Sequence, residues 1–175
     1  MKPGKILYIL GAFLFFLGLM MLLPLAWSLI YRDPDVEAFA VSIFITCSSG
    51  GFLYFISRSP GETTLSHREG FFIVAAGWLL AGIVGSLPYL IHGVIPGFTD
   101  AFFESVSGFT TTGATVLTGI DRLPHGILLW RSMTQWLGGM GIIILSIAIL
   151  PLLGVGGMQL YKAEMPSPVK DKLTP

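Results

Sequence analysis

Eleven residues near the middle of the chain decide its fold: Ser107-Gly108-Phe109-Thr110-Thr111-Thr112-Gly113-Ala114-Thr115-Val116-Leu117. They are rich in hydroxyl side chains, with a short apolar segment before them and a long apolar segment after them. Lipid offers no hydrogen-bond partners, so non-helical backbone persists at membrane depth only when it is buried in protein or lines a water-filled path. Carbonyl oxygens in such a path replace the water shell of a monovalent cation. The stretch therefore indicates one wall of an ion-selectivity filter.

The composition indicates an all-α polytopic membrane protein. Of the 175 residues, 53% are hydrophobic and only 11% are charged, and the mean hydropathy is +0.78. An ordinary soluble domain carries about 25% charged residues, and a helix needs roughly 20 apolar residues to cross a bilayer. The formal net charge is zero and no basic patch is present, which argues against nucleic acid as a partner. Cys47 is the only cysteine, so no internal disulfide can form, and we interpret it as a packing residue.

Four apolar segments are long enough to span a membrane. They cover residues 5–31, 37–57, 67–92 and 124–150. The first segment is longer than the roughly 7–15-residue core of a signal peptide and no clear cleavage site follows it, so we interpret it as a retained helix. Pro24 is expected to kink this helix. Ser66 and Glu69 have the spacing of a capping box, which predicts a helix start there.

A fifth segment, residues 99–109, is too short to span. At about 1.5 Å per residue it reaches only about 16 Å, whereas the hydrocarbon core is about 30 Å thick. Thr99 is a candidate N-cap, with Asp100 in the first turn. We therefore expect a re-entrant half-helix, after which extended chain returns to a polar turn at residues 121–124 on the same side.

Small residues recur at helical spacing in the long segments, a pattern that lets helices approach closely. They are Gly4, Gly11 and Gly18 in the first segment, Gly77, Ala81 and Gly85 in the third, and Gly138, Gly139 and Gly141 in the last. We expect packing faces, and a gating hinge is the alternative for the last set. Pro151 is expected to end or bend the last helix.

Lysine and arginine residues in the short loops set the expected orientation. With the N-terminus in the cytoplasm, seven of them lie inside and three outside. The inside set is Lys2, Lys5, Arg58, Arg68, Lys162, Lys170 and Lys172, and the outside set is Arg32, Arg122 and Arg131. This excess predicts that both termini are cytoplasmic, which requires four full crossings and one re-entrant segment.

The order of helix, half-helix, extended chain and helix is that of a pore loop. The predicted ligands are the main-chain carbonyls of Thr110, Thr111, Thr112 and Gly113. Carbonyls that point the same way demand unusual backbone angles, and glycine adopts a positive φ without a Cβ clash. The C-terminal end of the half-helix, near Gly108 and Phe109, carries about half a negative charge, which favours a cation in the cavity beneath it.

Several other polar residues have two interpretations each. Asp100 and Glu104 are either acids at the outer mouth, where they concentrate cations, or solvated acids at a helix start. Arg131 either extends to the outer interface or braces the filter. His92 and His125 both lie near the outer face, but no carboxylate or cysteine at suitable spacing supports a metal site. Motifs of nucleotide-binding loops, metalloproteases and nucleophile elbows do not occur, so nothing favours an enzyme.

Three stretches resemble the Trk/Ktr/HKT superfamily of potassium-uptake proteins. Residues 107–115 (SGFTTTGAT) resemble its first pore loop, and residues 131–142 (RSMTQWLGGMGI) resemble the helix that follows the loop. Residues 151–160 (PLLGVGGMQL) continue the match. The two additional leading helices, about 5–57, are similar to the bacterial TrkH/TrkG branch. The resemblance covers essentially the whole chain.

The resemblance implies potassium uptake across the bacterial inner membrane, with K⁺ as the transported ion and no organic cofactor. It implies four helix–loop–helix repeats around one pore, a homodimer of the full-length protein, and a cytosolic nucleotide-binding partner of the TrkA type that gates it. It also implies that potassium binds the carbonyls of residues 110–113. The chain is then divided into a leading helix pair (1–66), the first repeat (67–153) and the start of a cytoplasmic linker (154–175).

One repeat supplies one quarter of a ring of carbonyls, so the chain alone does not close a pore. It is therefore either the N-terminal portion of a longer protein or one of four assembling copies. A second hypothesis is a membrane fragment or assembly module that does not conduct. A third is a secondary transporter with a broken helix, which expects ionisable residues at mid-membrane. Asp and Glu lie instead at helix ends and in loops.

Overall fold

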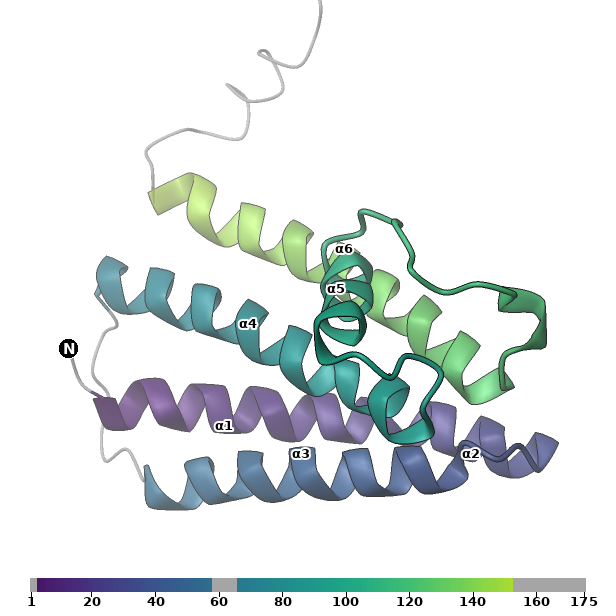
Figure 1. Cartoon of the computed structure of the whole chain (residues 1–175). Coiled ribbons are helices and arrows are strands. Elements are labelled where there is room, and N and C mark those ends of the chain that lie inside the picture. Colours follow the sequence, from purple (N-terminus) through teal and green to yellow (C-terminus); the bar gives the residue numbers. More distant parts are fainter. Residues whose placement is uncertain (1–2, 58–65, 153–175) are drawn as a thin grey trace, which may run out of the picture. The chain divides into compact units, whose positions relative to one another are not determined.

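The computed structural model describes residues 3–57 and 66–152, and every described regular element is helical. The α-helices are α1 (Pro3–Met20), α2 (Leu22–Tyr31), α3 (Val36–Ile56), α4 (His67–His92), α5 (Phe98–Phe109) and α6 (His125–Leu152), with a 3-10 turn at Ile120–Arg122 (Figure 1). The chain divides into two units, Met1–Gly138 and Gly139–Pro175, and the account below concerns the first. The predicted linker from residue 154 lies outside the described residues.

The predicted helices agree with the observed ones to within a few residues, and the differences have local causes. The first segment is broken at Met21, one turn before Pro24, because a proline lacks the N–H that the carbonyl of residue 20 needs. The capping box is confirmed: Glu69 N donates to Ser66 Oγ at 3.4 Å, and Ser66 N donates to Glu69 Oε2 at 3.1 Å.

The predicted N-cap of the short helix is wrong. Gly97 occupies that position with an extended backbone, so α5 begins at Phe98 and Thr99 lies inside its first turn. Asp100 is in the first turn, as expected, and is exposed. At the other end of the chain, α6 extends one residue past Pro151, so this proline coincides with the end of the helix.

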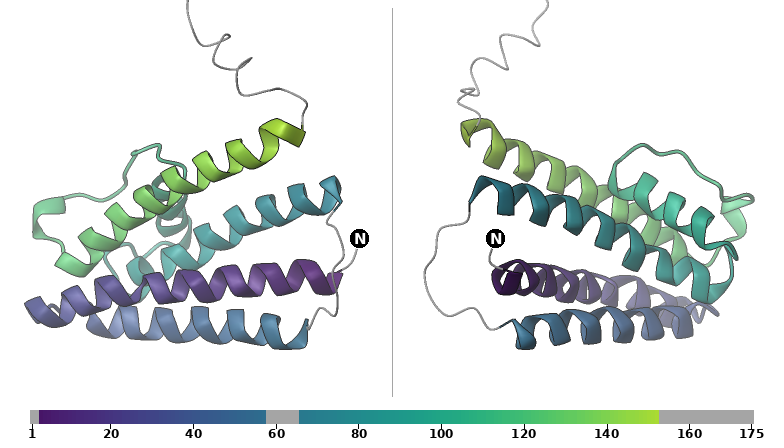
Figure 2. Two further views of the ribbon diagram at one scale, coloured as in Figure 1. Left: turned by 180° about the vertical axis from the view of Figure 1, so that it is seen from behind. Right: turned by 60° about the vertical axis from the view of Figure 1, so that its left-hand side comes forward.

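Three helices are long and apolar enough to cross a membrane among the residues that the structure describes. They are α1 with α2 (Pro3–Tyr31), α3 (Val36–Ile56) and most of α4 (Arg68–His92). α1 and α3 run antiparallel and side by side, α4 lies along α1, and the short α5 packs against α4 (Figures 1 and 2). Side chains on the outward faces of these helices are large and apolar, as contact with lipid requires.

Glycines set the close approach of α1 to α3. A Cβ at Gly11 would lie 2.8 Å from the carbonyl oxygen of Gly50, and a Cβ at Gly50 would lie 2.7 Å from the amide nitrogen of Phe15. Gly18 similarly faces Cys47 of α3, which confirms Cys47 as a packing residue. Gly4 has no neighbour within 4 Å of its Cβ position, so the predicted packing face covers only two of the three glycines.

Two neighbouring glycines test this packing. Gly50→Ala is expected to destabilise the chain by roughly 1–3 kcal/mol, because its Cβ meets backbone atoms that cannot move aside. Gly51→Ala is expected to be neutral or stabilising by up to about 1 kcal/mol, because a Cβ there meets nothing within 4 Å and alanine favours helix. Thermal unfolding in detergent compares the two variants. Equal effects would contradict the packing.

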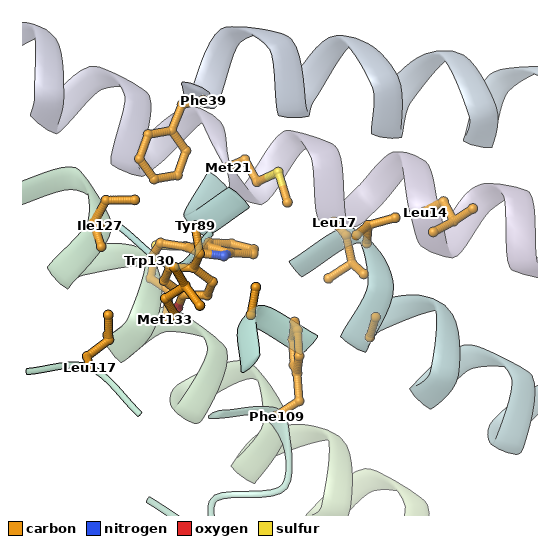
Figure 3. Close-up of a cluster of buried hydrophobic side chains, with 14 residues drawn as sticks. Leu14, Leu17, Met21, Phe39, Tyr89, Phe109, Leu117, Ile127, Trp130 and Met133 are labelled. Carbon is orange, nitrogen blue, oxygen red and sulfur yellow. The ribbon is translucent and has the colours of Figure 1, made fainter. Parts of the chain in front are cut away.

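A core of buried apolar side chains joins α1, α3, α4, α5 and α6, and it runs along α1 from Leu14 to the helix break at Met21 (Figure 3). Its largest fully buried members are Trp130, Tyr89, Phe39 and Leu17. Trp130 Nε1 donates to the carbonyl oxygen of Gly85 at 2.9 Å, so the indole satisfies its one donor inside the core and ties α6 to α4. This core forms the support on which α5 and the following loop rest.

Candidate functional site

The short helix α5 ends in a Schellman motif built on the threonine run. Thr112 N donates to Ser107 O at 3.0 Å and Thr111 N donates to Gly108 O at 2.9 Å, which are the two bonds that define this motif. The motif requires a left-handed residue at the position that glycine usually fills, and Thr111 occupies it with φ 57°. The threonine run is therefore a helix cap as well as the start of the loop.

The positive φ of Thr111 is unusual because threonine is β-branched. A left-handed backbone costs an L-residue about 1–2 kcal/mol, and a strained residue persists only where its surroundings over-determine it. Thr111 Oγ1 donates to the carbonyl oxygen of Thr110 at 2.7 Å, a local bond that stabilises the turn. Nothing in the sequence predicts this conformation, because the expected left-handed residue was Gly113.

Gly113 also has a positive φ, 77°, as the sequence predicted. Its Cβ position meets nothing within 4 Å, so the backbone conformation alone and not crowding calls for glycine. Residues 110–116 are all exposed in this chain by itself. Residues 110–116 therefore present two left-handed residues, Thr111 and Gly113, two positions apart on an exposed surface.

The carbonyl groups of the loop differ in their availability. The Thr110 carbonyl accepts from Thr111 Oγ1 at 2.7 Å, and the Ala114 carbonyl accepts from Ser107 Oγ at 2.6 Å. Within the described residues, no hydrogen bond reaches the carbonyls of Thr111, Thr112 and Gly113. Unsatisfied carbonyl oxygens at the surface of a loop are free to bind a ligand.

Most carbonyls in the last turn of α5 already accept hydrogen bonds. Val106 O accepts from both the amide and the hydroxyl of Thr110 at 2.8 Å, and the carbonyls of Ser107 and Gly108 accept the cap bonds. The aligned peptide dipoles of the helix remain, so its end still favours a cation. The free carbonyls lie instead in the loop that follows.

Glu104 is not a solvated acid or an acid of the outer mouth. Its side chain is only 2% exposed, and it bonds the loop and α6 together. Oε1 accepts from Arg131 Nε at 2.9 Å and from Thr115 Oγ1 at 3.0 Å. Oε2 accepts from Thr115 Oγ1 at 2.8 Å and from Val116 N at 3.0 Å. Of the two interpretations of Arg131, the structure therefore supports the brace.

Two glycines let α5 pack directly on α6. A Cβ at Gly108 would overlap Thr134 Oγ1, and a Cβ at Gly138 would overlap the carbonyl oxygen of Phe109. Of the two interpretations of the glycine cluster in the last helix, Gly138 therefore fits the packing face. The backbone at the end of α5, which is where the loop begins, is positioned by this contact.

Two aspartates of the turn between α2 and α3 hold the start of α6. Asp33 Oδ2 accepts from His125 N at 2.8 Å, and Asp35 Oδ2 accepts from Ile127 N at 3.0 Å. The first amides of a helix have no partner within the helix and its N-terminus favours negative charge, so these carboxylates stabilise α6. No sequence pattern predicted these contacts, because the partners are 92 residues apart.

His125 belongs to this cap and not to a metal site. Its Nδ1 lies 2.8 Å from Asp33 Oδ2, and its ring stacks on Tyr31 with centroids 4.1 Å apart. Among the described residues, no cluster of three or more histidine, cysteine or acidic side chains is placed to hold a metal ion. The pair His92 and His125, considered from the sequence, is therefore not supported.

The cap makes stability depend on pH. Desolvation alone would raise the pKa of Asp33, but the amide and the ring of His125 outweigh it and lower the pKa below its ordinary value of 3.8. When folding lowers the pKa of a carboxyl group, the ionised group stabilises the folded state at pH values above its unfolded pKa. This stabilisation is lost as the pH falls through the folded pKa. The unsubstituted chain is therefore expected to melt at a higher temperature than Asp33→Asn at pH 6, and this difference is expected to shrink below about pH 4. A difference that is constant from pH 6 to pH 3 would contradict this.

Comparison with known proteins adds independent findings. Residues 36–174 match the TrkH family, described as a cation transport protein. A Trk system potassium uptake protein TrkH of Salmonella typhimurium is 55% identical over 154 residues, which cover 86% of this chain and 31% of that protein. A protein of the same name from Halomonas elongata is 51% identical, with 100% of this chain and 36% of that protein covered.

A solved structure agrees with these matches. The crystal structure of the potassium transporter TrkH from Vibrio parahaemolyticus superimposes with a TM-score of 0.84 at 44% sequence identity, covering 90% of this chain and 34% of that chain. This chain therefore spans about a third of the length of these relatives.

Proposed function

Because the chain belongs to the TrkH family of cation transport proteins, we propose that it supplies the first pore loop of a potassium-uptake protein in the bacterial inner membrane. The relatives named above are uptake proteins and not enzymes. K⁺ is the transported ion in this proposal and no organic cofactor takes part. The observation that carries it is the exposed loop with two left-handed residues and free carbonyls that follows the buried C-terminal part of α5.

The proposed ligands are the main-chain carbonyls of Thr110, Thr111, Thr112 and Gly113. Those of Thr111, Thr112 and Gly113 have no partner within the described residues, so they are the principal candidates. The Thr110 carbonyl already accepts from Thr111 Oγ1, and in the proposal it shares that bond with the ion. Carbonyl dipoles arranged in a ring replace the hydration shell of K⁺.

The proposed membrane arrangement has four crossings and one re-entrant helix. α5 has 12 residues and a length of about 18 Å, which is too short to cross a core of about 30 Å. α6 has 28 residues and is long enough to make the fourth crossing after α1–α2, α3 and α4. The lysine and arginine distribution supports the proposal that both termini are cytoplasmic.

The remaining three quarters of the filter come, in this proposal, from further repeats of the same longer protein. Each repeat contributes one set of loop carbonyls around a common axis. The complete protein is proposed to form a homodimer and to bind a cytosolic nucleotide-binding subunit of the TrkA type. The proposed division is a leading pair at 1–66, one repeat at 67–153 and a linker at 154–175.

The test is rubidium-86 uptake by a chimera in which this chain replaces the matching third of the Salmonella relative. Proteoliposomes that hold the chimera are expected to take up rubidium, with potassium as competitor. The chain alone is expected to take up none, because one quarter of a ring does not close a pore. A chimera that inserts with native stability but takes up no rubidium would contradict the proposed function. Uptake by the chain alone would contradict the interpretation that it is part of a longer protein and would favour an assembly of four copies.

A further inference from the structure

The loop residues that follow the free carbonyls in the chain are held against one face of α5. Ser107 Oγ donates to Ala114 O at 2.6 Å, and Glu104 accepts from Thr115 Oγ1 and Val116 N. Glu104 and Ser107 are three positions apart in the helix and therefore lie on one face. Three consecutive loop residues, 114–116, are thus held to α5 at two points.

The other end of the free stretch is fixed as well. Thr110, Thr111 and Thr112 each donate their amide to a carbonyl of the last turn of α5. The carbonyls of Thr111, Thr112 and Gly113 therefore lie between two anchored ends, the helix cap and the contacts at residues 114–116. The position of the second anchor determines how far the three carbonyls extend from the helix.

The second anchor depends on a charge. A carboxylate buried to 2% exposure is costly unless it is paired and hydrogen-bonded. Both oxygens of Glu104 are satisfied, and the guanidinium of Arg131 neutralises the charge at 2.9 Å. Arg131 is 22% exposed and belongs to α6, so the pair joins the half-helix, the loop and the following helix at one point.

We propose that the Glu104–Arg131 pair is a positioning device that sets the spacing of the loop carbonyls and thereby the discrimination between potassium and sodium. The pair does not touch the ion in this account. The proposal rests on the proposed function of the loop. It assigns to Glu104 and Arg131 a role that neither the family match nor the relatives' names state.

The first variant is Glu104→Gln in the same chimera. Glutamine has nearly the same shape, but one carboxylate oxygen becomes an NH₂ donor that faces the donors of Arg131 or Val116. We expect the variant to insert at the normal level. The preference for potassium over sodium, measured as competition with rubidium uptake, is expected to fall about 10-fold or more. A change of tenfold in a ratio of this kind corresponds to about 1.4 kcal/mol.

The matched control is Asp100→Asn. Asp100 lies one turn before Glu104 on α5 and is exposed, so the substitution removes the same charge but no contact with the loop. Its ion preference is expected to stay within about twofold of the unsubstituted chimera. An equal loss of preference in both variants would mean that the acids act through their field on cations in solution, and it would overturn the positioning role.

A second variant keeps the proposal testable if Glu104→Gln does not insert. Thr115→Val removes the hydroxyl that bonds both oxygens of Glu104 and leaves the buried charge pair intact. It is expected to insert normally and to lower the ion preference several-fold. If Thr115→Val or an inserted Glu104→Gln keeps the full preference, the proposal is overturned. An unsubstituted chimera that takes up no rubidium would instead contradict the proposed function itself.

Discussion

Gly138→Ala is expected to lower rubidium uptake by the chimera about 100-fold. The added Cβ overlaps the carbonyl oxygen of Phe109 and lies 2.6 Å from its carbonyl carbon and 2.8 Å from its Cα. These are backbone atoms at the end of α5, so they can move only if the helix end and the loop move with them. A displacement of about 1 Å at a functional site can cost about 100-fold in rate.

The measurement for Gly138→Ala is the initial rate of rubidium-86 uptake at equal protein content. Gly70→Ala is the control, because Gly70 is also helical and a Cβ there meets nothing within 4 Å. Its uptake is expected to remain within about twofold. If Gly138→Ala keeps full uptake, the close contact of α6 with the end of α5 does not position the loop.

Gly113→Ala is expected to lower uptake at least about tenfold and to weaken the competition by potassium relative to sodium. Alanine in a left-handed conformation costs about 1–2 kcal/mol, so the residue tends to leave φ 77° and turn its carbonyl away. Gly113→Pro is expected to abolish uptake, because proline fixes φ near −65°.

Gly119 offers a matched control for this strain. It also has a positive φ, 65°, and nothing within 4 Å of its Cβ position, but it follows residues 114–116, which are hydrogen-bonded to α5. Gly119→Ala therefore introduces the same local strain outside the proposed ligand set, and uptake is expected to stay within about twofold. Equal losses in Gly113→Ala and Gly119→Ala would show that backbone strain anywhere in the loop lowers uptake, and would contradict a specific role for Gly113.

Features that depend on local chemistry were predicted well from the sequence. The apolar segments gave the helices to within a few residues, the spacing of Ser66 and Glu69 gave the capping box, and the glycine after the threonines gave a positive φ. Each of these depends on residues that are at most a few positions apart. The family resemblance, which depends on contiguous motifs, is confirmed by the match to residues 36–174.

Features that depend on distant partners were missed. Glu104 was interpreted either as an acid at the outer mouth or as a solvated acid at a helix start, but the structure buries it against Thr115 and Arg131, which are 11 and 27 residues away. The aspartates that cap α6 are 92 residues from their partners. Contacts between residues so far apart leave no periodicity or spacing in the sequence. Thr111 was missed for a different reason: its cap bonds are local, but threonine disfavours the left-handed backbone that this position of the cap requires.

The central claim is that the carbonyls of this loop coordinate the transported ion. The most direct measurement is anomalous X-ray scattering from crystals of the chimera in which thallium(I) replaces potassium. The account predicts a thallium peak in contact with the carbonyl oxygens of Thr111, Thr112 and Gly113. Ordered thallium elsewhere along the pore, with these three carbonyls bonded to protein groups instead, would contradict it.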